Sequence, residues 1–203
     1  MKIKICGMRE SENIKEVAAL SPDYMGFIFY KSSPRYITQI PENLSQEIKK
    51  TGVFVNEDYE HIMEKAELFG LQAVQLHGKE TAELCDKLKN ENLEVIKAFS
   101  VDEEFNFGTL APYIKATTYF LFDTKGKNYG GNGVTFNWGI LQNYTYQHPF
   151  FLSGGIAIKH IQEIKKIKQS SLPLAGVDLN SKFEIAPGFK NTDLLKQFKD
   201  LMQ

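Results

Sequence analysis

The stretch Phe150-Phe151-Leu152-Ser153-Gly154-Gly155-Ile156 decides the fold of this chain. Its three large apolar residues are typical of a short buried strand, and its two glycines are typical of a tight turn. The residues that follow, up to 168, read as an amphipathic helix. A strand that turns directly into such a helix is one βα unit, and a domain built from such units repeats them along the chain.

The same alternation runs through the whole sequence. We expect strands at 2–6, 24–29, 52–56, 73–76, 94–99, 119–123, 150–153 and 176–179. We expect helices near 11–20, 42–50, 57–69, 80–90, 102–114, 137–143, 156–168 and 191–202. Strands that alternate with helices predict right-handed βαβ units and a parallel sheet.

Eight βα units in about 200 residues close naturally into a (β/α)₈ TIM barrel. The alternative is an open, doubly wound sheet, which usually has fewer strands and carries a glycine-rich fingerprint in its first βα turn. The first turn here is Cys6-Gly7-Met8-Arg9, which lacks that fingerprint. The sequence therefore predicts an α/β protein in which residues 1–203 form a single (β/α)₈ barrel domain.

Composition excludes several classes of function. Lys and Arg number 24 against 25 Asp and Glu, without the basic excess that is usual for proteins that bind nucleic acid or anionic membranes. We expect neither partner. The N-terminus lacks the pattern of a signal peptide, so we expect a cytoplasmic protein whose two cysteines, Cys6 and Cys85, are free thiols. The four histidines are scattered, and we expect no metal site.

Polar side chains end most of the expected strands. In a barrel, the carboxyl ends of the strands form the catalytic face. We therefore expect the following residues at that face: Cys6, Asn56, His77, Lys97, Asp123, Ser153 and Asp178.

Two of these residues are candidates for acid–base chemistry. Cys6 lies at the mouth of the first strand, although a lone cysteine on a buried strand is more often a small core residue. Asp123 ends the run Tyr119-Phe120-Leu121-Phe122, where a desolvated carboxyl group is suited to donating a proton. The alternative for Asp123 is a residue that caps a helix or fixes a loop. His77 is expected only to close its strand.

Three loops carry candidate binding residues. Gly154 and Gly155 precede a helix, where backbone N–H groups bind anions, and barrel phosphate sites follow strands seven and eight. A glycine pair also suits any tight turn. The glycine-rich segment 130–133 is either a flexible turn or a lid over substrate. Arg35 is either a surface residue or a bidentate partner for a substrate carboxylate.

Taken in order, these segments resemble the phosphoribosylanthranilate isomerase family from residue 4 to about 190. The matching segments are Lys4-Ile5-Cys6-Gly7-Met8, Gly26-Phe27-Ile28-Phe29, Ser33-Pro34-Arg35-Tyr36-Ile37, Gly52-Val53-Phe54-Val55-Asn56, Val74-Gln75-Leu76-His77-Gly78, Phe122-Asp123-Thr124, Gly130-Gly131-Asn132-Gly133-Val134-Thr135-Phe136-Asn137-Trp138 and Leu152-Ser153-Gly154-Gly155. Any one segment is weak evidence, whereas the ordered set is strong.

The resemblance implies an Amadori rearrangement in tryptophan biosynthesis, in which N-(5-phosphoribosyl)anthranilate becomes 1-(2-carboxyphenylamino)-1-deoxyribulose 5-phosphate. Asp123 would be the general acid and Cys6, as a thiolate, the general base. Arg35 would hold the anthranilate carboxylate, and Asp178 would contact the amine or hydroxyls. The phosphate would lie against Gly154, Gly155, Asn180 and Ser181. The reaction implies neither metal nor cofactor, and we expect a monomer or a homodimer.

One departure from the family concerns the phosphate site. The family commonly has Asp-Val-Ser-Ser-Gly-Val-Glu after strand eight, whereas this chain has Asp178-Leu179-Asn180-Ser181-Lys182-Phe183-Glu184. Lys182 therefore replaces a glycine. We expect its ammonium group to point to solvent, because a lysine head is strongly hydrated.

The sequence is compatible with two other functions. One is a neighbouring phosphate-binding barrel such as indole-glycerol-phosphate synthase, which relies on catalytic lysines and glutamates. Lys97 is the only strand lysine expected to be well placed for that chemistry. The other is a non-catalytic barrel that binds phosphorylated ligands, against which the presence of both Cys6 and Asp123 argues.

Overall fold

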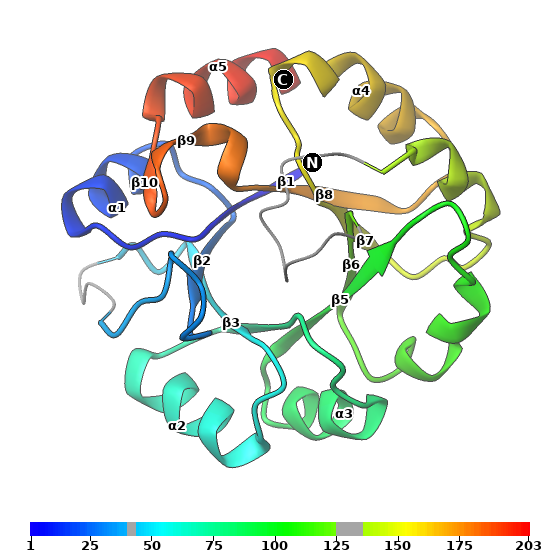
Figure 1. Ribbon diagram of the computed structural model, residues 1–203, viewed down its shortest axis with the longest axis horizontal. Coiled ribbons are helices and arrows are strands. Elements are labelled where there is room, and N and C mark those ends of the chain that lie inside the picture. Colours follow the sequence, from blue (N-terminus) through cyan, green and yellow to red (C-terminus); the bar gives the residue numbers. More distant parts are fainter. Residues whose placement is uncertain (40–43, 125–135) are drawn as a thin grey trace.

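Parallel strands close into a barrel in the computed structural model, which describes residues 1–39, 44–124 and 136–203 (Figure 1). The barrel strands are β1 (Lys2–Cys6), β2 (Tyr24–Ile28), β3 (Lys49–Phe54), β4 (Ala73–Leu76), β5 (Glu94–Val101), β6 (Tyr119–Thr124), β7 (Phe150–Leu152) and β8 (Leu174–Leu179). Each strand pairs with the next, and β8 closes the ring by pairing with β1. The predicted (β/α)₈ barrel is confirmed.

Helices surround the barrel, as Figure 1 shows. The α-helices are α1 (Ser11–Ala18), α2 (Tyr59–Phe69), α3 (Ala82–Asn90), α4 (Ile161–Gln169) and α5 (Thr192–Met202). The short 3₁₀ helices are η1 (Phe107–Tyr113), η2 (Trp138–Asn143), η3 (Ile158–His160) and η4 (Ser181–Phe183). Over the described ranges, none of these helices combines the length and apolarity needed to cross a bilayer.

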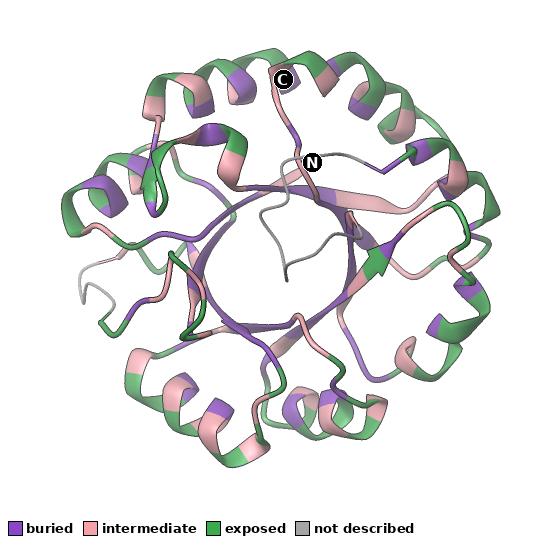
Figure 2. Ribbon diagram, viewed as in Figure 1, coloured by how far each residue is buried: buried purple, intermediate pink, exposed green. Residues whose placement is uncertain are grey.

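Alternation along the strands separates two cores. Successive side chains point to opposite faces of a strand, so that one set packs outward against the helices and the other fills the barrel. The interior cluster consists of Tyr24, Ala73, Ile96, Ala98, Leu121 and Phe151. Buried residues line the strands, while exposed residues gather on the outer helices (Figure 2). The barrel interior is thus packed with apolar side chains toward the amino ends of the strands, and polar side chains line it at the carboxyl ends.

The helix expected over 42–50 is wrong in its described part. Residues 44–48 are irregular apart from one turn, and Lys49 and Lys50 begin β3, where Lys49 lies opposite Tyr24. The sequence Lys49-Lys50-Thr51 resembles the surface of a helix. Both ammonium groups instead reach the rim of the barrel at the amino ends of the strands. There, Lys49 pairs with Glu94, and Lys50 donates a hydrogen bond to the Phe69 carbonyl. Long lysine stems allow this arrangement on a strand.

Other expected helices are shorter or tighter than the sequence suggests. The segments 102–114 and 137–143 form only η1 and η2, and η1 contains Pro112, which cannot donate a backbone hydrogen bond. The helix after Gly155 begins as η3 at Ile158. The small antiparallel pair β9 (Glu184–Ala186) and β10 (Phe189–Lys190) was not expected. It follows η4 and carries two charged residues to the site.

Candidate active site

A cavity of about 580 Å³ opens at the carboxyl ends of the barrel strands. Its wall includes every residue for which a catalytic or binding role is expected. These residues are Cys6, Arg35, Asp123, Gly154, Gly155, Asp178, Asn180 and Ser181. Residues that are far apart in the sequence therefore share one polar space, while the segment 130–133, expected as a lid, lies outside the described residues.

Cys6 ends β1 with its side chain inside the barrel. It is only 3% exposed and lies opposite Gly26 on β2. Burial raises the pKa of the Cys6 thiol above its ordinary value, and Asp178 adds to this effect, while Lys4 and Lys190 oppose it. Without substrate the neutral thiol is favoured. A cationic intermediate above the sulfur would shift this balance towards the thiolate.

Asp123 lies near the end of β6 and has two fixed contacts. Its Oδ1 accepts a hydrogen bond from the backbone N–H of Thr124 at 2.9 Å, and its Oδ2 lies 3.2 Å from Nε2 of His77. The Asp123 side chain is 7% exposed. Asp123 is therefore held in one orientation at the cavity wall, with His77 as its neighbour.

Gln75, which sequence reasoning missed, completes a row of three polar side chains with His77 and Asp123. Gln75 and His77 both point inward from β4, and the Gln75 amide lies 2.7 Å from Nδ1 of His77. With Nε2 of Gln75 as the donor, Nδ1 accepts and Nε2 of His77 donates to Asp123. Their spacing of two residues on a strand could have revealed this shared face.

Arg35 is held by a carboxylate of its own chain. Its Nε and Nη2 donate to the two oxygens of Glu184 at 2.8 Å and 2.6 Å. Glu184 also accepts from Nζ of Lys190 at 2.6 Å, and that ammonium donates to Oδ1 of Asn180. Burial favours the neutral form of Glu184, but these two cations outweigh it and hold its pKa below the ordinary value. Glu184 and Lys190 were not expected at the site.

Asp178 accepts hydrogen bonds at both oxygens. Lys4 donates to Oδ1 at 2.8 Å, and the Ser153 hydroxyl donates to Oδ2 at 3.3 Å. The register explains the first contact, because Lys4 on β1 lies directly opposite Asp178 on β8. Each carboxylate oxygen has a second lone pair, so Asp178 can still accept a hydrogen bond from a ligand in the cavity.

The two glycines after β7 have conformations that other residues rarely adopt. Gly154 has φ +85° and Gly155 has φ +63°. A Cβ at position 154 would lie 2.2 Å from Oγ1 of Thr124, which no side chain tolerates. The turn therefore needs glycine for close backbone approach. Across the cavity, η4 begins at Ser181, and the exposed Lys182 lies at the rim.

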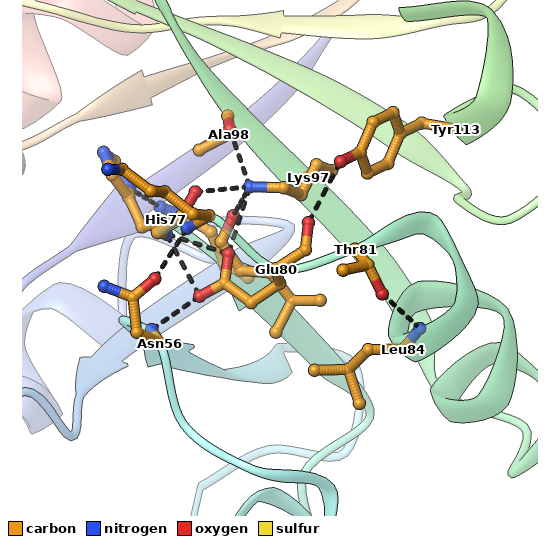
Figure 3. A network of polar contacts seen from close by, with 12 residues as sticks. Asn56, His77, Glu80, Thr81, Leu84, Lys97, Ala98 and Tyr113 are labelled. Carbon is orange, nitrogen blue, oxygen red and sulfur yellow. Dashed lines mark hydrogen bonds and ion pairs between the residues drawn. The ribbon is translucent and has the colours of Figure 1, made fainter.

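Two residues expected at the catalytic face do not line the cavity. Lys97 points away from the interior, and its Nζ donates to Oε2 of Glu80 and to the Gly78 carbonyl (Figure 3). Glu80 in turn accepts from the backbone N–H groups of Asn56 and Gly78. Lys97 and Asn56 thus fix the turn that follows His77. Lys4, in contrast, points into the barrel beside the site, where it contacts Asp178.

The fold and the cavity define a class of protein. Here a buried thiol and a carboxyl group from different strands share a polar cavity at the carboxyl ends of a (β/α)₈ barrel. Active sites of barrel enzymes occupy this face, built from strand ends and βα loops. The class is therefore a barrel enzyme, and comparison with known proteins identifies its family.

The chain belongs to the N-(5′-phosphoribosyl)anthranilate isomerase family, whose model matches residues 3–200. It is 46% identical to the N-(5′-phosphoribosyl)anthranilate isomerase of Phocaeicola vulgatus, over 98% of this chain and 96% of that protein. The crystal structure of phosphoribosyl anthranilate isomerase from Thermotoga maritima superposes with a TM-score of 0.84 at 34% identity, over 100% of this chain and 98% of that one. Another isomerase structure holds reduced 1-(o-carboxyphenylamino)-1-deoxyribulose 5-phosphate; it has a TM-score of 0.82 and 31% identity, over 100% and 98% of the two chains.

Proposed function

We propose that Cys6 and Asp123 carry out the family's isomerisation as general base and general acid. The substrate is N-(5-phosphoribosyl)anthranilate, and the product is 1-(2-carboxyphenylamino)-1-deoxyribulose 5-phosphate. The observation that supports this most directly is the shared cavity: strands β1 and β6 bring a thiol and a carboxyl group to one space. Each acid–base contact typically contributes about 10²–10⁴-fold in rate.

The reaction begins at the ring oxygen of the ribose. Asp123 gives its proton to that oxygen, the bond from the oxygen to C1′ breaks, and the amine nitrogen supplies the electron pair of the resulting iminium. The iminium acidifies the C2′–H bond. The Cys6 thiolate takes that proton, and the bonding pair forms the enolamine. Protonation at C1′ and loss of the enol proton then give the ketone.

Arg35, Asp178 and the loop residues bind the substrate in this proposal. Arg35 pairs with the anthranilate carboxylate while Glu184 holds its other edge. Asp178 accepts from the amine or hydroxyls. The phosphate lies against Gly154, Gly155, Asn180 and Ser181, and Asn180 offers its Nδ2 because its Oδ1 accepts from Lys190.

The assembly and setting of the protein are part of the same proposal. We expect residues 1–203 to act as one domain, as a monomer or homodimer, in the cytoplasm. One Thermotoga maritima structure is described as monomers made from a dimeric isomerase, so both states occur in that relative. Light scattering of the purified protein measures its state directly.

The deciding experiment is a fluorescence assay with freshly prepared N-(5-phosphoribosyl)anthranilate. The wild-type protein should remove the anthranilate-type fluorescence without forming an indole product, and Cys6→Ala should not. Formation of an indole from added 1-(2-carboxyphenylamino)-1-deoxyribulose 5-phosphate, with no loss of the fluorescence of N-(5-phosphoribosyl)anthranilate, would indicate indole-glycerol-phosphate synthase instead. Unchanged fluorescence with tight binding of the substrate would indicate a non-catalytic barrel.

A further inference from the structure

A fully buried lysine lies on the interior face of β1, two residues before Cys6. Lys4 is 0% exposed, and its Nζ donates to Oδ1 of Asp178 at 2.8 Å. A lysine inside a barrel loses its hydration and is retained only where other groups compensate its charge. Burial works against the charge of Lys4, but Asp178 and Cys6 outweigh it and raise the pKa of the ammonium group. Lys4 is therefore a cation within the core.

The ammonium group of Lys4 also lies near the Cys6 sulfur. The two side chains share one face of β1, and the charge of Lys4 lowers the pKa of the Cys6 thiol. Gly26 lies opposite Cys6 on β2, where a Cβ would be 2.8 Å from Sγ of Cys6 and 3.1 Å from Nζ of Lys4. Both atoms thus border the same small space, and the missing side chain of Gly26 keeps that space open.

Four charged groups face Cys6 from the elements packed around it. Lys4 comes from β1, Asp178 from β8, Lys190 from β10 and Arg35 from the loop after β2. Lys4 has the largest effect among these charges and lowers the pKa of the thiol, while Asp178 raises it. Lys190 and Arg35 are both tied to Glu184, which neutralises part of their effect.

We propose that Lys4 is a positioning residue for the base, with its ammonium group shared between Asp178 and the Cys6 sulfur. This inference rests on the proposed role of Cys6. When the sulfur is a thiolate, Lys4 stabilises it through a charged hydrogen bond. When the sulfur has taken the C2′ proton, Lys4 keeps its bond to Asp178 and still has a counter-charge. The buried cation is thus compensated in both states of the reaction.

The test measures the ionisation of Cys6 without requiring turnover. Iodoacetamide alkylation of the wild type, Lys4→Met, Asp178→Asn and the double variant is followed against pH, with mass spectrometry resolving each cysteine. Cys85 is the internal reference, because burial raises its pKa to about 12. Circular dichroism melting establishes that each variant is folded.

Lys4→Met should slow the labelling of Cys6 at neutral pH about tenfold or more, because the thiolate loses a stabilising cation and the pKa of the thiol rises further. Its kcat should fall about tenfold with KM within a few-fold. Asp178→Asn should speed labelling, because the ammonium then serves the sulfur alone. The double variant should label slowly again.

Lys4→Met leaves the Asp178 carboxylate buried without its cation and is the variant at risk of not folding. The double variant removes both charges and keeps the test decisive. If the double variant labels as fast as Asp178→Asn, Lys4 does not act on Cys6 and the inference is overturned. That outcome leaves the role of Cys6 untouched, since the activity of Cys6→Ala tests it separately.

Discussion

Arg35 and Glu184 form a bidentate ion pair at the cavity wall, with Nε donating to Oε1 at 2.8 Å and Nη2 to Oε2 at 2.6 Å. The pair orients the planar guanidinium and uses one of its edges. Within the described residues, Nη1 has no hydrogen bond to the protein. Glu184 thus acts as a support that leaves the other edge of Arg35 available to a carboxylate from the substrate.

Arg35→Gln should raise KM about tenfold or more while kcat changes less. A charged hydrogen bond contributes about 1.5–3 kcal/mol, and about 1.4 kcal/mol is tenfold in affinity. Steady-state kinetics with the fluorescence assay measures both constants. Lys65→Gln, half-buried on α2 and outside the cavity, is the control and should leave both unchanged. A lower melting temperature with unchanged KM would mean that Arg35 only supports the loop.

Cys6→Ala should lower kcat about 10²-fold or more with little change in melting temperature. The matched control is Cys85→Ala on α3, a buried cysteine outside the cavity. It removes a sulfur from the core and should reduce stability without affecting kcat. If Cys6→Ala keeps activity within a few-fold, the thiol is a core residue and another base has to be found.

The pH profile of kcat/KM should rise with pH as Cys6 loses its proton. Burial raises the pKa of this thiol, so the protonated form, which cannot accept a proton, predominates in the free enzyme at neutral pH. The active thiolate therefore becomes more abundant as pH increases. A flat profile between about pH 6 and pH 9, with proton transfer shown to be rate-limiting, contradicts the assignment of Cys6 as base.

Asp123→Asn should also lower kcat sharply, because an amide cannot supply the proton for ring opening. Asp58→Asn is the control, since Asp58 caps α2 and asparagine caps equally well.

His77→Asn should have a smaller effect of about tenfold on kcat, because it removes the contact that orients Asp123. Equal losses for Asp123→Asn and His77→Asn would show instead that His77 takes part in the proton transfer.

At the phosphate site, Gly155→Asp should raise KM about tenfold or more, by placing a carboxylate where the phosphate is expected. Lys182→Gly should change KM little, because Lys182 is exposed at the rim. Steady-state kinetics of both variants tests the location of the phosphate. A large rise in KM for Lys182→Gly would show that this chain uses the lysine to bind the anion.

The sequence predicts much of this architecture because strand alternation is a local property. It places Cys6, Asp123 and Asp178 inside the barrel, and the structure agrees. The prediction is wrong where it has to decide which face of a strand points into the barrel. Lys97 was expected at the catalytic face, but its ammonium group points outward and pairs with Glu80. The prediction also fails for partners such as Lys4 and Asp178, which lie 174 residues apart and meet only through the register between β1 and β8.

That register makes the site a late product of folding. The seam between β1 and β8 closes only after the last strand of the barrel has been synthesised, and contacts between such distant residues form slowly. A nascent chain that still lacks residues 174–203 has Cys6 but neither Asp178 nor Lys190 beside it. The burial of Cys6 therefore depends on the last strand of the barrel, so the thiol becomes inaccessible only when residues 174–179 have joined β1.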